Sequence, residues 1–94
     1  MQFFCRMLAV AMTVALVHGT AQAQSIKIGI NQPLTGASAA FGTFVSNGAR
    51  IAADEINVKG GVLGQKLELI VEDSKSNPTE AAAVAEKLIT RDKV

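Results

Sequence analysis

Residues 26–42 read IKIGINQPLTGASAAFG, and this stretch guides the interpretation of the whole chain. The alternating, β-branched pattern of Ile26–Ile30 is typical of a strand. Pro33 is expected to end that strand, because proline has no backbone N–H to give to a sheet. Small residues dominate Leu34–Gly42, which is expected to be a loop with Phe41 as its lone aromatic. A loop of this kind is a candidate wall of a small-molecule site.

A helix is expected from about Thr43 to Val58, because apolar residues recur there at steps of three and four. The residues expected to form its core-facing stripe are Phe44 or Val45, Ala49, Ala52, Ala53 and Ile56. Gly60 follows the last turn, where a glycine commonly ends a helix in the left-handed conformation.

Leu67–Asp73 is expected to be a second, buried strand, since it is fairly apolar on both faces. A second helix is expected over Pro78–Thr90. Asn77 is a suitable N-cap, Pro78 fits the first helical position, and Glu80 stands where a capping box has its acid. The residues expected to face inward are Ala81, Val84, Ala85 and Leu88, with Ile89 as a further candidate.

The order of expected elements is strand, helix, strand, helix. Such alternation predicts an α/β fold with a parallel sheet and crossover helices, the start of a doubly wound domain. In such folds ligands bind at the carboxyl edge of the sheet, and the loop after the first strand lies at that edge.

The first 23 residues have the pattern of a secretory signal peptide. Arg6 supplies a positive charge, Met7–Val17 is apolar, and Ala21-Gln22-Ala23 is a small-x-small cleavage signal. The apolar run is shorter than the roughly 20 residues that a membrane-spanning helix needs. Cys5 precedes the apolar run, whereas a lipidated cysteine would follow it, so no lipid anchor is expected.

Several kinds of site are excluded within residues 24–94. The only cysteine and the only histidine, Cys5 and His18, lie in the signal segment. Disulfides, Cys- or His-ligated metals and histidine-based catalysis are therefore not expected in residues 24–94. The same segment has eight acidic and eight basic side chains, so its formal charge is zero. It lacks the basic patch of a nucleic-acid binder.

The glycines of the first loop do not match a nucleotide-binding motif. Gly36 and Gly42 are separated by five residues, and Thr43 follows without the lysine of a P-loop. The dinucleotide fingerprint G-x-G-x-x-G is also absent. A phosphate cradle is therefore not expected.

Two pairs of neighbouring carboxylates, Asp54 with Glu55 and Glu72 with Asp73, also invite a functional interpretation. Adjacent side chains on a helix or strand point in different directions, so neither pair is expected to share a proton. Asp73 ends a strand at the binding edge, and it is expected to bond the loop that follows it, through Ser74 or Ser76.

Phe41 has two interpretations from its pattern alone. It is either a core residue at the start of a helix or an apolar lid over a ligand, and the pattern favours the core. Phe41 and Phe44 are the only aromatics after residue 23, and a core this small is marginal without disulfides or metals. Residues 24–94 are therefore expected to be the N-terminal piece of a longer protein.

A set of motifs then links the segment to a known family. They are Pro33-Leu34-Thr35-Gly36, Asn47-Gly48, Ala52, Ile56-Asn57, Gly60-Gly61-Val62, Gly64, Asp73, and the helix from Asn77-Pro78 to Leu88-Ile89. In this combination the segment resembles the periplasmic solute-binding proteins of ABC transporters. The branch it resembles is the leucine/isoleucine/valine-binding one, which includes urea- and short-amide-binding relatives.

The resemblance implies a two-lobed receptor without catalysis or cofactor, exported to the periplasm, with residues 24–94 as the first part of lobe 1. It would be monomeric when complete, bind a branched-chain or other small amino acid or a related amide, and deliver it to a membrane permease. By resemblance, Phe41 takes the place of an aromatic in the ligand's side-chain pocket, with Ser38, Ala39 and Ala40 beside it. The family's anchors for the carboxylate and amine of an amino acid lie on later loops.

Two alternatives from other classes remain open. One is an exported α/β enzyme whose catalytic residues lie beyond residue 94. The other is a sensor of amides or aromatic acids on the same fold. The residues after Val94 would distinguish them, since an enzyme needs a nucleophile–base pair or a metal cluster there.

Overall fold

The computed structural model describes residues 24–94, and the predicted signal peptide lies outside the described residues. The chain forms β1 (Ile26–Gln32), α1 (Ala39–Val58), β2 (Leu67–Asp73) and α2 (Pro78–Thr90) in that order. The predicted succession of strand, helix, strand and helix is confirmed, and the bounds of β2 and α2 agree with the sequence pattern.

The two strands pair in parallel and in full register, from Ile26 beside Leu67 to Gln32 beside Asp73. Their carboxyl ends therefore lie at one edge of the sheet. The N–H of Ser74 donates to the carbonyl of Gln32 over 3.0 Å and continues the ladder one step beyond β2. The predicted parallel α/β arrangement is confirmed.

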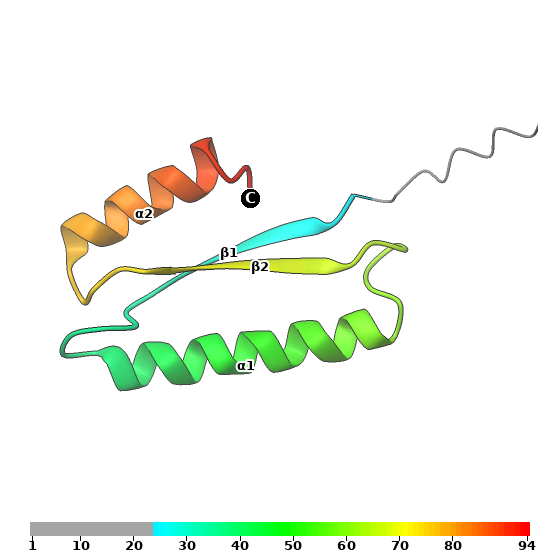
Figure 1. The fold of residues 1–94 in the computed structure, drawn as a ribbon, viewed down its shortest axis with the longest axis horizontal. Helices are drawn as coiled ribbons and strands as arrows, with labels where there is room; N and C mark the ends of the chain where they lie inside the picture. The colour runs from blue at the N-terminus through cyan, green and yellow to red at the C-terminus, as the bar shows by residue number, and fades with distance from the viewer. Residues whose placement is uncertain (1–23) are drawn as a thin grey trace, which may run out of the picture.

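The two helices cover opposite faces of this sheet, with α1 below the strands and α2 above them in the view of Figure 1. Residues at alternate positions of β1 face α2, as the pleat of a strand requires. Asn31 Nδ2 donates to the carbonyl of Ala81 over 2.9 Å. A β-carbon at Gly29 would lie 3.0 Å from Leu88 Cδ1, so glycine lets α2 pack close to the strand.

The prediction for the first helix was wrong at its start, because α1 begins at Ala39 and not at Thr43. Residues 39–42 belong to the first turn of the helix, and the loop after β1 is shorter than expected. The Ser38 side chain makes no capping hydrogen bond. The Ala39 N–H donates instead to the carbonyl of Gly36 over 3.2 Å. A helix start without a side-chain cap gives no signal in the sequence.

The prediction for the inward face of α1 was also largely wrong. The buried residues of α1 are Gly42, Ser46 and Ala53, with Ala49 half-buried. The other residues that were expected to face the sheet are exposed within residues 24–94. They are Phe44, Val45, Ala52 and Ile56. Small side chains face the sheet because the helix backbone lies too close to leave room for large ones. Of the predicted stripe, Ala49 and Ala53 are confirmed.

The predicted glycine stop of the first helix is confirmed. Gly60 and Gly61 have φ of 104° and 81°, in the left-handed region. Their N–H groups donate to the carbonyls of Asn57 and Ile56, which is the pairing of a Schellman motif. The side-chain amide of Asn57 then pairs with the backbone of Leu67, donating over 2.8 Å and accepting over 2.7 Å. This amide fixes the end of α1 to the start of β2.

The second helix largely follows its prediction. Asn77 Oδ1 accepts from the N–H groups of Thr79 at 2.8 Å and Glu80 at 3.3 Å, so the predicted N-cap is confirmed. The reciprocal half of a capping box is replaced, because the Asn77 N–H donates to the carbonyl of Ser74. Val84 and Leu88 are buried as expected, but Ile89 is exposed and its prediction was wrong.

Candidate functional site

The candidate site lies at the carboxyl edge of the sheet, where the loops after β1 and β2 meet. The first loop runs over residues 33–38 and leads into α1, and the second runs over residues 74–77 and leads into α2. Parallel strands in full register bring both loops to the same edge. Side chains at the end of β2 and in the second loop therefore reach the first loop.

Asp73, the last residue of β2, is the main link between the two loops. Its Oδ1 accepts hydrogen bonds from the N–H groups of Leu34 at 2.8 Å and Thr35 at 3.3 Å. Its Oδ2 accepts from the Thr35 hydroxyl at 2.7 Å. The Lys75 N–H also donates to Oδ1, over 2.7 Å. One carboxylate thus bonds both to the turn that follows β2 and to the start of the loop after β1, 38 residues earlier in the sequence.

These donors lower the pKa of Asp73 from its ordinary 3.8 to about 2. The largest cause is the hydrogen bond from the Thr35 hydroxyl, and the N–H groups of Lys75, Leu34 and Thr35 act in the same direction. Partial burial opposes them by disfavouring the charged form. All four donors favour the ionised carboxylate, so Asp73 is charged at neutral pH.

The lowered pKa predicts how acid affects stability. A carboxylate whose pKa is lower in the folded than in the unfolded state stabilises the fold fully above its unfolded pKa of 3.8. That stabilisation is lost as the pH falls through the folded pKa of about 2. We expect the denaturant midpoint of Asp73→Asn to lie below that of the wild type at pH 6 and to converge on it between pH 4 and pH 2. A gap that stays constant down to pH 2 would contradict this assignment.

Ser76 is the second link between the loops. Its hydroxyl donates to the carbonyl of Thr35 over 2.7 Å and accepts from the N–H of Ser38 over 3.1 Å. A β-carbon at Gly36 would lie 2.9 Å from Ser76 Oγ, and Gly36 has φ of 85°. Glycine is therefore required in this turn on two grounds, its left-handed backbone and the nearby hydroxyl.

The four residues predicted to contact ligand lie together at the end of this loop and in the first turn of α1. Ser38, Ala40 and Phe41 are exposed within residues 24–94, and Ala39 is half-buried. The Phe41 side chain is 67% exposed, so in this part of the chain it does not contribute to the core. Its contact with a ligand stays a prediction.

The sequence did not identify Asp73 as a partner of the first loop. It was expected to bond the loop after it, and the contact to Lys75 fits that expectation, although the donor is a backbone N–H and not Ser74 or Ser76. Its contacts to Leu34 and Thr35 depend on the parallel register, which no local pattern specifies. An acid at the carboxyl end of the neighbouring strand was the one available signal.

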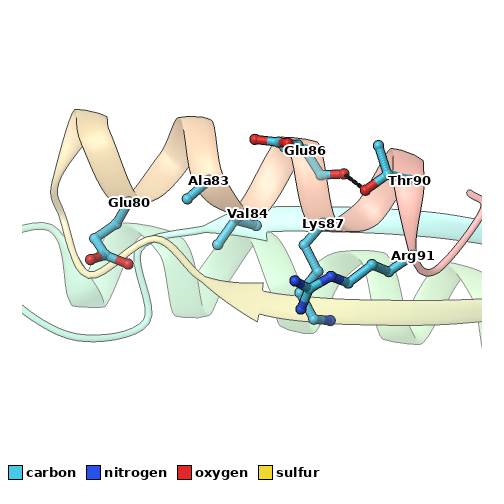
Figure 2. Close-up of a pocket in the computed structure, with 7 residues that line it drawn as sticks. All are labelled: Glu80, Ala83, Val84, Glu86, Lys87, Thr90 and Arg91. Carbon is cyan, nitrogen blue, oxygen red and sulfur yellow. Dashed lines mark hydrogen bonds between the residues drawn. The ribbon is translucent and has the colours of Figure 1, made fainter.

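A separate surface hollow lies along α2 and is shown in Figure 2. It is lined by Glu80, Ala83, Val84, Glu86, Lys87, Thr90 and Arg91. None of the four predicted ligand contacts lines it, and all of its walls come from α2 and the residue that follows it, Arg91. Lys87 in this hollow already pairs with Glu72 and Asp92, and these two partners raise its pKa above the ordinary value. We therefore place the candidate site at the edge of the sheet and not in this hollow.

Two further features are absent from residues 24–94. No three histidine, cysteine, aspartate or glutamate side chains of these residues lie where they could share a metal ion. No helix in this part of the chain combines the length and apolar character needed to cross a membrane.

Comparison with known proteins identifies the family. The sequence profile of periplasmic binding proteins matches residues 25–94, which is most of the chain. The chain belongs to the periplasmic binding protein family. The resemblance inferred from the sequence motifs is therefore confirmed, and so is the fold that this family implies.

Two relatives illustrate the similarity. The chain is 47% identical over 64 residues to the Leu/Ile/Val-binding protein BraC3 of Rhizobium johnstonii, covering 68% of this chain and 17% of that protein. It is 38% identical over 86 residues to an amino acid binding protein of Pseudomonas aeruginosa, covering 92% of this chain and 23% of the relative.

A solved structure shares the same arrangement. It is the crystal structure of the branched-chain amino acid transporter substrate binding protein LivJ of Streptococcus pneumoniae in complex with isoleucine. The TM-score is 0.73 at 46% identity, over 74% of this chain and 20% of LivJ. The chain thus spans 17–23% of the length of these three relatives.

Proposed function

We propose that the protein is a substrate-binding receptor of an ABC importer that captures a branched-chain or other small amino acid, or a related amide. It acts in the periplasm after removal of residues 1–23, and it delivers its ligand to a membrane permease without chemical change. Residues 24–94 form the first part of one lobe, and a second lobe completes the site. The similarity to isoleucine-bound LivJ carries this proposal.

The geometry at the carboxyl edge of the sheet supports the same function. The end of the first loop and the first turn of α1 present Ser38, Ala40 and Phe41 on the surface, and Asp73 and Ser76 hold this loop. An exposed aromatic ring next to small residues is a suitable wall for an aliphatic side chain. A ligand held between this wall and a second lobe stabilises the closed form, because it contacts both lobes only when they close.

The test is calorimetry on the complete protein without its signal peptide, after unfolding and refolding to remove any ligand that copurifies. We expect L-isoleucine, L-leucine or L-valine to bind with a Kd on the order of micromolar or tighter. Binding of benzoate, with no binding of any small amino acid or short amide, would contradict the ligand class. If mass spectrometry shows that the protein converts the added compound into a product, the enzyme alternative is favoured and the receptor function is overturned.

A further inference from the structure

The clearest feature without an assigned role is a set of hydrogen bonds to the loop after β1. They come from the last residue of β2 and from the loop that follows β2. Asp73 and Ser76 contact Leu34, Thr35 and Ser38, three residues of the loop that leads into α1. We call this set of contacts the loop clamp. Two side chains satisfy five backbone or hydroxyl groups across a gap of 38 to 41 residues in sequence.

The backbone of the second loop supports the importance of the clamp. Lys75 and Ser76 have φ of 55° and 56°, in the left-handed region that residues with a β-carbon seldom adopt. Two consecutive residues in this region store strain, which the surrounding structure must offset. This conformation brings the Lys75 N–H to Asp73 and the Ser76 hydroxyl to Thr35 and Ser38. The strained turn therefore coincides with the clamp.

Apart from the clamp, the loop has two backbone hydrogen bonds at the start of α1, from the Ala39 N–H to Gly36 and from the Gly42 N–H to Ser38. Thr35, Gly36, Ala37 and Ser38 are exposed and small, and Gly36 adds backbone freedom. Ser38 does not cap α1 with its side chain; its carbonyl accepts from the Gly42 N–H over 3.1 Å, and its own N–H donates to Ser76. Without the clamp, the loop and the first turn of α1 would be free to sample other conformations before a ligand arrives.

We propose that Asp73 and Ser76 are positioning residues that set the ligand-binding wall Ser38–Phe41 in its binding conformation before ligand arrives. This inference rests on the proposed function of that wall. Neither residue needs to touch the ligand. A site ordered in advance loses less conformational freedom on binding, and the saving appears as affinity. The clamp therefore controls affinity through the first loop.

The experiment compares variants of the complete, ligand-free protein. Ser76→Ala removes one oxygen, Asp73→Ala removes the carboxylate, and Asp73→Asn keeps an acceptor of nearly the same shape. The matched control is Glu72→Gln on the preceding residue of β2, because Glu72 pairs with Lys87 of α2 and not with the loop. Amide hydrogen exchange at Leu34, Thr35 and Ser38 reports loop order, and calorimetry with L-isoleucine reports affinity.

We expect Ser76→Ala and Asp73→Ala to speed exchange at the loop amides and to weaken isoleucine binding about tenfold, with β1 and β2 still protected. Asp73→Asn should recover most of the affinity, and Glu72→Gln should bind as the wild type does. A merely structural role would lower the unfolding midpoint and leave the affinity of the folded protein unchanged.

Two results would overturn the positioning role alone. One is faster loop exchange with unchanged affinity, and the other is weakened affinity with loop amides as protected as in the wild type. If Asp73→Ala does not fold, Ser76→Ala decides the question, since it changes a single oxygen. A wild-type protein that binds no branched-chain or other small amino acid and no related amide would overturn the proposed function, and the positioning role with it.

Discussion

Gly42→Ala is expected to destabilise the complete protein by about 2 kcal/mol or more, although alanine is the better helix former. In an exposed helix the same substitution would gain up to ~1 kcal/mol. At Gly42, however, a β-carbon would overlap the carbonyl oxygen of Pro33 and lie 2.7 Å from its carbonyl carbon. The helix start must then move away from the loop after β1. Overpacking of this kind costs roughly 1–3 kcal/mol and occasionally more, so the clash outweighs the helix preference.

The matched control is Gly48→Ala on the same helix. No other group lies within 4 Å of a β-carbon at Gly48 in residues 24–94, so only the helix preference acts there. Denaturant midpoints should fall for Gly42→Ala and rise slightly for Gly48→Ala. Equal midpoints for the two variants would mean that α1 does not pack as closely on Pro33 as the structure indicates.

The most predictable elements were those whose signals are local. The bounds of β2 and α2 follow from an apolar run and from the cap at Asn77, whose side chain bonds the first turn as expected. The end of α1 follows from Gly60, which adopts the left-handed conformation that favours glycine. The parallel sheet follows from the alternation of strands and helices.

The inward face of α1 could not be predicted in the same way. Periodicity of apolar residues selects the large ones, and either Phe44 or Val45 satisfied it. The structure instead buries Gly42 and Ser46, which hydropathy does not rank as core residues. What decides the face is the short distance between helix and strand–loop backbone, which only the tertiary structure specifies. The early start of α1 was missed for a different reason, because Ser38 makes no side-chain cap that the sequence could signal.

The candidate site shows the same division between local and distant signals. Phe41 and its neighbours were predicted from their place after the first strand and from the family resemblance, and their contact with a ligand stays a prediction. The contacts of Asp73 and Ser76 to that loop span 38 to 41 residues and arise from strand register. A single sequence contains no pattern that links them.

Phe41→Ala is expected to weaken isoleucine binding about tenfold to a hundredfold in the complete protein. Burying a phenylalanine side chain against an apolar partner is worth roughly 1.5–3 kcal/mol, and every 1.4 kcal/mol changes a Kd about tenfold. In residues 24–94 the ring is 67% exposed, so its removal takes little from the packing between α1 and the sheet. The unfolding midpoint of the ligand-free protein should therefore change little. Calorimetry and thermal unfolding of the same preparation measure both quantities.

Phe44→Ala is the matched control for this effect. Phe44 lies three residues further along α1, and its ring is 76% exposed, so truncation removes the same side chain from the same helix. If the ligand wall is Ser38–Phe41, the Phe44 variant should keep its affinity while the Phe41 variant loses it. A fall in the unfolding midpoint of Phe41→Ala with unchanged isoleucine affinity would mean that Phe41 is a core residue and not a ligand contact. Equal losses of affinity in both variants would indicate a general effect on α1 and not a contact made by the Phe41 ring.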